Sequence, residues 1–102
     1  MEHKDFSQRL SELRINKGVS ARDMSLSIGL SPSYINNIET GISYPSMTTF
    51  FYICEFLNIT PMEFFDFESV NPAKEHELLL AAKGLDSKQL ETLIDLAKGL
   101  KK

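Results

Sequence analysis

The sequence predicts an all-α protein made of five helices, a linker and a two-helix extension. Most glycines and prolines lie between apolar segments, at places where helices start or stop. Within those segments the apolar residues recur at helical spacing, and we find no strand-like alternation. The chain has 102 residues, of which 42% are hydrophobic, which favours one compact domain with an appendage. We therefore expect a domain over residues 1–66, a linker over 67–72 and a helical extension over 73–102.

The first two helices are expected from about Asp5 to Lys17 and from Ala21 to Ile28. An apolar stripe marks the first helix, and it consists of Phe6, Leu10 and Leu13. Asp5 and Gln8 predict a capping box at its start, in which side chains satisfy free backbone groups. Ser20 is the predicted cap of the second helix.

The third helix is expected to begin with Ser31 as its cap and Pro32 in its first turn, and to end at Gly41. Only Gly29, Leu30 and Ser31 separate it from the second helix. A glycine-containing turn this short is typical of the helix-turn-helix unit. The same spacing also fits an ordinary helical hairpin within a bundle.

The fourth helix is expected to follow Pro45 and Ser46, and the fifth to begin with a capping box at Thr60-Pro61-Met62-Glu63. The next helix is expected to start at Asn71-Pro72, and the last has Asp86 as its predicted cap. The last helix has the most complete start signal, because Gln89 closes a capping box with Asp86. Leu85 and Leu90 add a hydrophobic staple across the same cap. We expect these helices to end near Leu57, within the 60s, near Lys83 and near the C-terminus.

The composition argues against an enzyme. The single cysteine, Cys54, lies in an apolar run, so we expect it to pack in the core and to form no internal disulfide. His3 and His76 are the only histidines, and neither lies in a metal-ligand pattern. No glycine-rich phosphate loop is present. We therefore predict no catalytic residues, no metal, no cofactor and no small-molecule ligand.

The hydropathy of the chain predicts a soluble cytoplasmic protein without membrane contact. The N-terminal segment lacks the apolar stretch of a signal peptide. The longest apolar run is far shorter than the ~20 residues that span a bilayer.

The outward face of the third helix carries the most informative side chains. At about 100° per residue, Ile35 and Ile38 set the buried direction. The side chains that then point outward are short and polar, and they are Ser33, Asn36, Asn37 and Thr40. Asparagine can donate to and accept from an adenine edge in the major groove of DNA. The alternative is a face that is simply solvated.

The order and spacing of these features are similar to those of a known family. The matching residues around the third helix are Ser31, Tyr34, Ile35, Ile38, Glu39, Gly41, Pro45 and Ser46. The stretch from Arg9 to about Phe65 resembles the Cro/lambda-repressor-like helix-turn-helix regulators, also called the XRE family. The resemblance implies a five-helix lambda-repressor-like domain. It also implies a prokaryotic-type transcriptional regulator, a repressor, that binds double-stranded DNA sequence-specifically.

The resemblance further implies which residues meet DNA, because the third helix of this family enters the major groove. By position, the base-reading residues would be Pro32, Ser33, Asn36 and Asn37. The residues on the phosphate backbone would be Ser20, Ala21, Arg22, Ser31, Thr40, Ser43 and Tyr44. Arg14 and Glu39 correspond to a structural ion pair that ties the third helix to the first.

Four positions depart from the family pattern. Ala21 stands where many members carry a glutamine that meets a phosphate. Met24-Ser25 replaces the usual Leu-Ala of the second helix. Pro32 has no backbone N–H, so it can offer a base only an apolar contact, for example to a thymine methyl. These departures bear on the list of DNA contacts and leave the fold unaffected.

The charge balance is low for a DNA-binding protein. The formal net charge is -3, and residues 1–62 contain five basic and six acidic side chains. Helix N-termini and a second copy of the protein could supply the missing phosphate contacts. We therefore predict specific but modest binding with a shallow salt dependence. The low basic charge also keeps open an alternative, in which the fold is a protein-interaction or antitoxin-like module with weak DNA binding.

The C-terminal extension raises the question of a partner. The fourth predicted helix is apolar nearly all round, and Leu78, Leu79 and Leu80 make a broad apolar surface in the extension. A helix that is apolar on every side must be buried on every side. Intramolecular packing, a second copy, or a different protein such as an antagonist could supply the cover. We expect a homodimer, formed through the extension or through the outer side of the fourth helix.

Overall fold

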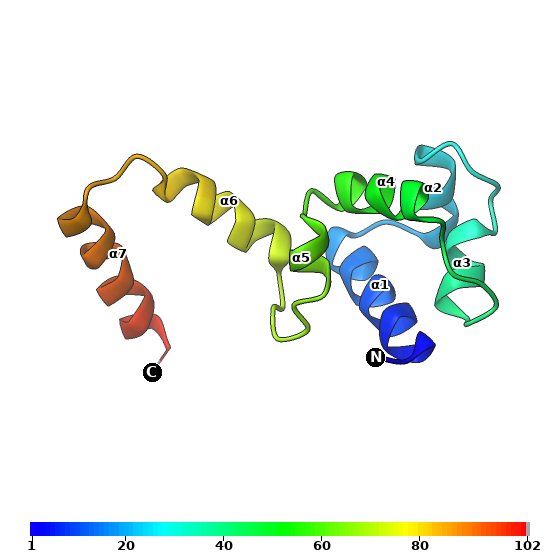
Figure 1. Ribbon diagram of the computed structural model, residues 1–102, viewed down its shortest axis with the longest axis horizontal. Helices are drawn as coiled ribbons and strands as arrows, with labels where there is room; N and C mark the ends of the chain where they lie inside the picture. Colours follow the sequence, from blue (N-terminus) through cyan, green and yellow to red (C-terminus); the bar gives the residue numbers. More distant parts are fainter. Residues whose placement is uncertain (102) are drawn as a thin grey trace.

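The computed structural model describes residues 1–101, which form seven helices (Figure 1). In chain order these are α1 (His3–Lys17), α2 (Ala21–Ser27), α3 (Tyr34–Glu39), α4 (Met47–Leu57), α5 (Pro61–Phe64), α6 (Pro72–Ala82) and α7 (Ser87–Leu100). No strand occurs among these residues, so the all-α prediction is confirmed. We call α1–α5 the body and α6–α7 the tail.

The body encloses a single apolar core. Its buried hydrophobic side chains come from α1 to α5 and the short segments between them: Phe6, Leu10, Leu13, Met24, Ile35, Ile38, Phe50, Ile53, Cys54, Leu57, Ile59 and Phe64. Phe64 packs edge-on against Phe50, with ring centroids 5.1 Å apart, so α5 closes the core beside α4. Burial raises the pKa of the Cys54 thiol to about 11, as expected for a packing cysteine.

Most predicted helix starts are confirmed by cap geometry. The Ser20 hydroxyl accepts the Asp23 N–H at 3.0 Å, and the Ser46 hydroxyl accepts the Thr49 N–H at 3.1 Å. Reciprocal capping boxes form at the starts of α5 and α7, where the caps are Thr60 and Asp86. These signals are local, which is why the sequence alone could identify them.

The predicted start of α1 is wrong. The helix begins at His3, and its capping box joins Glu2 to Asp5 instead of Asp5 to Gln8. The Asp5 carboxylate accepts the Glu2 N–H at 2.8 Å, so Asp5 occupies the third helical position and not the cap. The helix starts earlier than predicted because Glu2, three residues before Asp5, can form the same reciprocal pair of hydrogen bonds.

Arg9 holds the segment after α5 against α1. Its side chain is 4% exposed, and burial lowers its pKa from the usual value. The guanidinium donates to four backbone carbonyl oxygens at 2.6–2.9 Å, those of Glu63, Phe64, Asp66 and Ser69. The residues between body and tail therefore follow a fixed path over α1.

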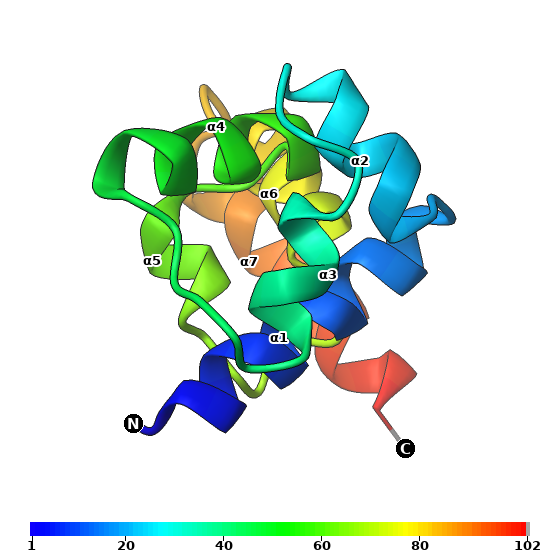
Figure 2. The ribbon, with the colours of Figure 1, turned by 90° about the vertical axis from the view of Figure 1, so that its right-hand side faces the viewer.

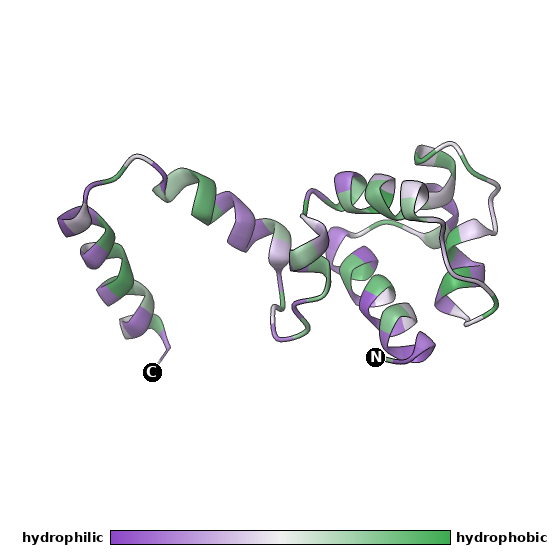
Figure 3. Cartoon of the chain, in the orientation of Figure 1, coloured by the Kyte–Doolittle hydropathy of each residue, from purple (hydrophilic) through white to green (hydrophobic). Residues whose placement is uncertain are grey.

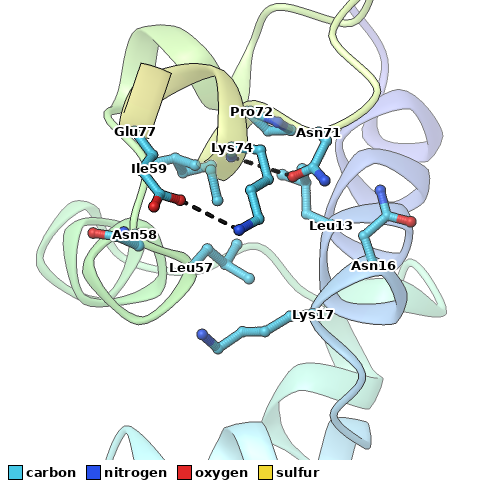
Figure 4. A pocket seen from close by; sticks show the side chains of 11 residues that line it. Leu13, Asn16, Lys17, Leu57, Asn58, Ile59, Asn71, Pro72, Lys74 and Glu77 are labelled. Atoms are coloured by element: carbon cyan, nitrogen blue, oxygen red, sulfur yellow. Dashed lines mark hydrogen bonds and ion pairs between the residues drawn. The ribbon is translucent and has the colours of Figure 1, made fainter. Parts of the chain in front are cut away.

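The tail leaves the body beside a shallow cleft of about 240 Å³. Side chains from α1, the end of α4 and the start of α6 line this cleft, among them Leu13, Leu57 and Lys74 (Figure 4). Lys74 Nζ lies 3.4 Å from the carboxylate of Glu77, one turn further along α6. On the body side, Asn16 donates to the Val70 carbonyl at 2.7 Å and secures the approach to α6.

Beyond this junction the tail extends away from the body (Figure 1). The radius of gyration is 16.1 Å and the longest dimension 49 Å. A compact domain of this length would have a radius of about 13 Å. The tail leaves the outer side of α4 uncovered, and Phe51 and Tyr52 are 48% and 51% exposed there. No helix in the described chain is both long and apolar enough to cross a bilayer.

Candidate nucleic-acid interface

The pair α2–α3 forms the end of the body that lies farthest from the tail (Figure 1). The chain turns between the two helices at Gly29, whose φ is +84°. A residue with a Cβ would be strained in this left-handed conformation. The turn is hydrogen-bonded back to α2, because the Leu30 N–H donates to the Ser25 carbonyl at 3.0 Å.

Ser25 joins the two helices from inside the body. Its side chain is fully buried, and its hydroxyl donates to the Ala21 carbonyl at 2.8 Å. The same oxygen accepts the Ile35 N–H at 3.0 Å. A free N–H at the start of α3 is thus satisfied by a side chain of α2.

This arrangement corrects the predicted start of the third helix. α3 begins at Tyr34, two residues later than a Ser31 cap implies, and the side chain of its N-cap residue, Ser33, makes no hydrogen bond to the first turn. Ser31 instead starts a turn in which its carbonyl accepts the Tyr34 N–H at 3.1 Å. Ser25 already occupies the Ile35 N–H, so α3 needs no local cap. We identified Ser25 in the sequence only as a departure from a family pattern.

Buried contacts fix α3 against α1 and the core. Ile35 and Ile38 are fully buried. The buried Ser7 hydroxyl of α1 donates to the Ile38 carbonyl at 2.6 Å. These contacts bury one side of α3 and leave the opposite side to solvent.

Arg14 and Glu39 form a two-pronged ion pair between α1 and α3. The distances are 2.7 Å from Nε to Oε2 and 2.9 Å from Nη2 to Oε1. The remaining arm, Nη1, donates to the Val19 carbonyl at 2.8 Å. The hydrogen bond to Glu39 raises the pKa of Arg14, and the pair is largely buried, with side chains 16% and 10% exposed. It therefore sets the rotation of α3 about its own axis.

The outward side of α3 faces away from every other helix of the described chain (Figure 2). Of the residues we expected to read bases, Pro32, Ser33 and Asn36 are exposed. Asn37 is only partly exposed, because the chain after α3 folds back over it. The Ile42 and Ser43 N–H groups both donate to the Asn37 carbonyl, at 2.8 and 3.2 Å.

The expected backbone-contact residues lie around the rim of this face. Ser20 and Arg22 are exposed at the start of α2, whereas Ala21 packs its methyl against the core. Ser31 is exposed in the turn and Thr40 at the end of α3, while Ser43 is partly exposed. The Thr40 hydroxyl donates to the Asn36 carbonyl at 2.8 Å, so its oxygen can still accept.

Tyr44 has a neighbour that the sequence did not reveal. Its ring is 57% exposed and stacks on the His3 imidazole with centroids 3.7 Å apart. His3 Nε2 lies 3.1 Å from the Ser43 carbonyl oxygen. His3 is some 40 residues away in sequence, and no local pattern connects it to Tyr44. The adjacent Ile42 is 73% exposed and is likewise a rim residue that we did not anticipate.

Side chains that bind a metal do not gather here or elsewhere in residues 1–101. The geometry is instead that of a rigid helix presenting short polar side chains on an open face. A helix-turn-helix family model matches residues 10–64, just over half of the chain. No match was found among curated proteins or among solved structures. The family match spans α2, the Gly29 turn and α3, and the chain belongs to the Cro/C1-type helix-turn-helix family of DNA-binding domains, also called the XRE family.

Proposed function

We propose that this protein is a sequence-specific regulator of transcription, a repressor, that inserts α3 into the major groove of double-stranded DNA. The observation that carries the proposal is the open polar face of α3, held at a fixed rotation by Ile35, Ile38 and the Arg14–Glu39 pair. A recognition helix must be rigid, because each base contact depends on where its side chain is placed.

The base-reading side chains in this proposal are Pro32, Ser33, Asn36 and Asn37. Asn36 is more exposed than Asn37, and the side-chain amide of either residue could form a paired contact with an adenine edge. Pro32 at the leading end of the face offers only apolar contact, which suits a thymine methyl. We therefore expect the half-site to be rich in A·T pairs.

The phosphate contacts would come from the rim. Arg22 brings the positive charge, and the hydroxyls of Ser20, Ser31 and Tyr44 can donate to phosphate oxygens. Thr40 would join them by turning its hydroxyl away from the Asn36 carbonyl. Few of these groups are charged, so phosphate binding contributes less to affinity than in strongly basic proteins. A second copy would double every contact and place two recognition helices one turn of DNA, about 34 Å, or a multiple of it apart on a pseudo-palindromic site.

Selection from random double-stranded DNA, followed by fluorescence anisotropy at low salt, tests the proposal. We expect a selected duplex to bind at least about a thousandfold more tightly than bulk DNA. Placing that site over a promoter should lower reporter expression when the protein is present. Equal binding of selected and bulk DNA would contradict the proposal and favour the alternative, a protein-interaction or antitoxin-like module.

A further inference from the structure

The two helices of the tail form an open V whose inner side is apolar. They diverge from the turn between them (Figure 1), and the later part of α6 and one side of α7 are hydrophobic (Figure 3). Between them lies a groove of about 410 Å³ whose lining is apolar apart from Glu75. Leu78 and Leu79 of α6 and Ile94 of α7 line it and are 60%, 57% and 50% exposed. The chain thus folds this surface without covering it.

α7 has a wide apolar face that α6 leaves largely uncovered. None of its residues is buried. Its groove-lining residues are Leu90, Leu93, Ile94, Leu96, Ala97 and Leu100. At about 100° per residue these six span an arc of about 160°. A surface helix carries an apolar stripe of about 100° or more. Here Ile94, Leu96 and Leu100 are 50%, 60% and 79% exposed beside α6, so the arc is open to a second helix.

The charges of the tail fit a second copy of the same chain. Residues 72–101 contain five lysines and five acidic residues, so two tails approach without net repulsion. Glu91 and Lys98 are seven residues apart and therefore lie on the same flank of α7, beside Leu90 and Ile94. Residues on the same flank face each other when two identical helices pair antiparallel. Centred between residues 94 and 95, such a pair would align Glu91 of each copy with Lys98 of the other.

We propose that the protein dimerises through its tail, with the α7 helices of two copies packed antiparallel about a two-fold axis near Ile94. Each α7 then fills part of the open groove of the other copy. A single two-fold interface covers the apolar arc of both copies, because each copy presents the same surface. The proposal specifies the partner and interface of the regulator proposed above, on which it rests. Its test is performed without DNA, so that the two proposals can fail separately.

Charge reversal within α7 of the full-length chain gives the sharpest experiment. In the Glu91→Lys dimer, a lysine at position 91 would face Lys98 of the other copy at both ends of the interface. In the Lys98→Glu dimer, a glutamate at position 98 would face Glu91 of the other copy at both ends. We expect each variant alone to weaken the dimer about tenfold in sedimentation-velocity analysis. An equimolar mixture of the two variants should recover the dimer, since each heterologous pair is again attractive. Failure of the mixture to recover would overturn the antiparallel arrangement.

A second pair of variants separates packing from folding. Ile94→Glu places a charge on the proposed axis, and we expect it to weaken the dimer about a hundredfold or more. Thr92→Glu adds the same charge on the opposite face of α7 and should leave the dimer unchanged. Circular dichroism of both variants checks that the helices are retained. A monomeric wild-type chain, or a dimer that Phe51→Glu disrupts and Ile94→Glu does not, would refute the proposed interface.

Discussion

Ser25 shows how much one buried hydroxyl determines at the residue scale. It connects α2 to α3 through the Ile35 N–H, and no neighbour in sequence replaces it. Ser25→Ala should lower the free energy of unfolding by about 1–3 kcal/mol, because a buried N–H would lose its acceptor. Urea denaturation measures the change. Ser27→Ala, at an exposed position of the same helix, is the control and should change stability by less than about 0.5 kcal/mol. An equal, small effect of both variants would show that Ser25 is not the link.

Asn37 provides the residue-scale test of base reading. Asn37→Ala should lose about 1–3 kcal/mol at one base position of the selected duplex. Competition binding against single-base variants of that duplex measures the loss position by position. Thr92→Ala, in α7 at the far end of the molecule, is the control and should leave the preference intact. An unchanged preference in Asn37→Ala would mean that Asn37 does not read a base.

Cys54 gives the protein a pH dependence of known sign. Burial raises the pKa of its thiol from 9.0 to about 11, so the folded state keeps this proton longer than the unfolded chain does. Stability from this group is complete below pH 9.0 and is lost as the pH rises toward 11. From pH 8 to 10 the wild type should lose about 1 kcal/mol more unfolding free energy than Cys54→Ala. Denaturant titrations at the two pH values measure this difference, and parallel curves would contradict it.

Arg9 acts at the scale of elements, because it fixes the chain between α5 and α6. Arg9→Met would leave four backbone carbonyls without their hydrogen-bond donor, and it should destabilise the body by about 2–4 kcal/mol. We also expect faster amide exchange over residues 64–70, measured by hydrogen exchange and mass spectrometry. Arg22→Met, at an exposed position, is the control and should change neither quantity. Unaltered exchange in Arg9→Met would show that other contacts hold this segment.

The helices themselves show what local sequence can predict. Ser20, Thr60 and Asp86 cap the helices that they were expected to cap, because a cap bonds a backbone group three residues away. The two errors have different causes. At α1, two overlapping pairs, Glu2–Asp5 and Asp5–Gln8, could form a capping box, and the pair nearer the N-terminus forms it. At α3, a side chain from another helix provides the cap, which no local pattern could reveal.

At the scale of the whole molecule, charge controls how the protein binds DNA. Residues 1–62 contain only five basic side chains, and Arg14 is committed to Glu39. The logarithm of the binding constant should therefore fall gently with the logarithm of salt concentration, since the slope tracks the phosphates neutralised. Anisotropy titrations over a salt series measure this slope. A slope as steep as about -10 would contradict the prediction.

The elongated shape separates two surfaces with different chemistry. The polar face of α3 lies at one end of the 49 Å long axis and the apolar tail at the other (Figure 1). Tail-to-tail association would therefore leave both recognition faces open. This separation agrees with a regulator in which one end binds DNA and the other end brings two copies together.

The sequence by itself determined the helical class, most helix boundaries, the buried side of α3 and the family resemblance that the match over residues 10–64 confirms. These depend on periodicity and capping, which act over a few residues. Tertiary structure alone decided the cap of α3 by Ser25, the stacking of His3 on Tyr44, the clamp formed by Arg9 and the detached tail. Each depends on groups that are distant in sequence or on how whole helices pack. A local pattern specifies which face of a helix is apolar, but only packing determines what covers that face.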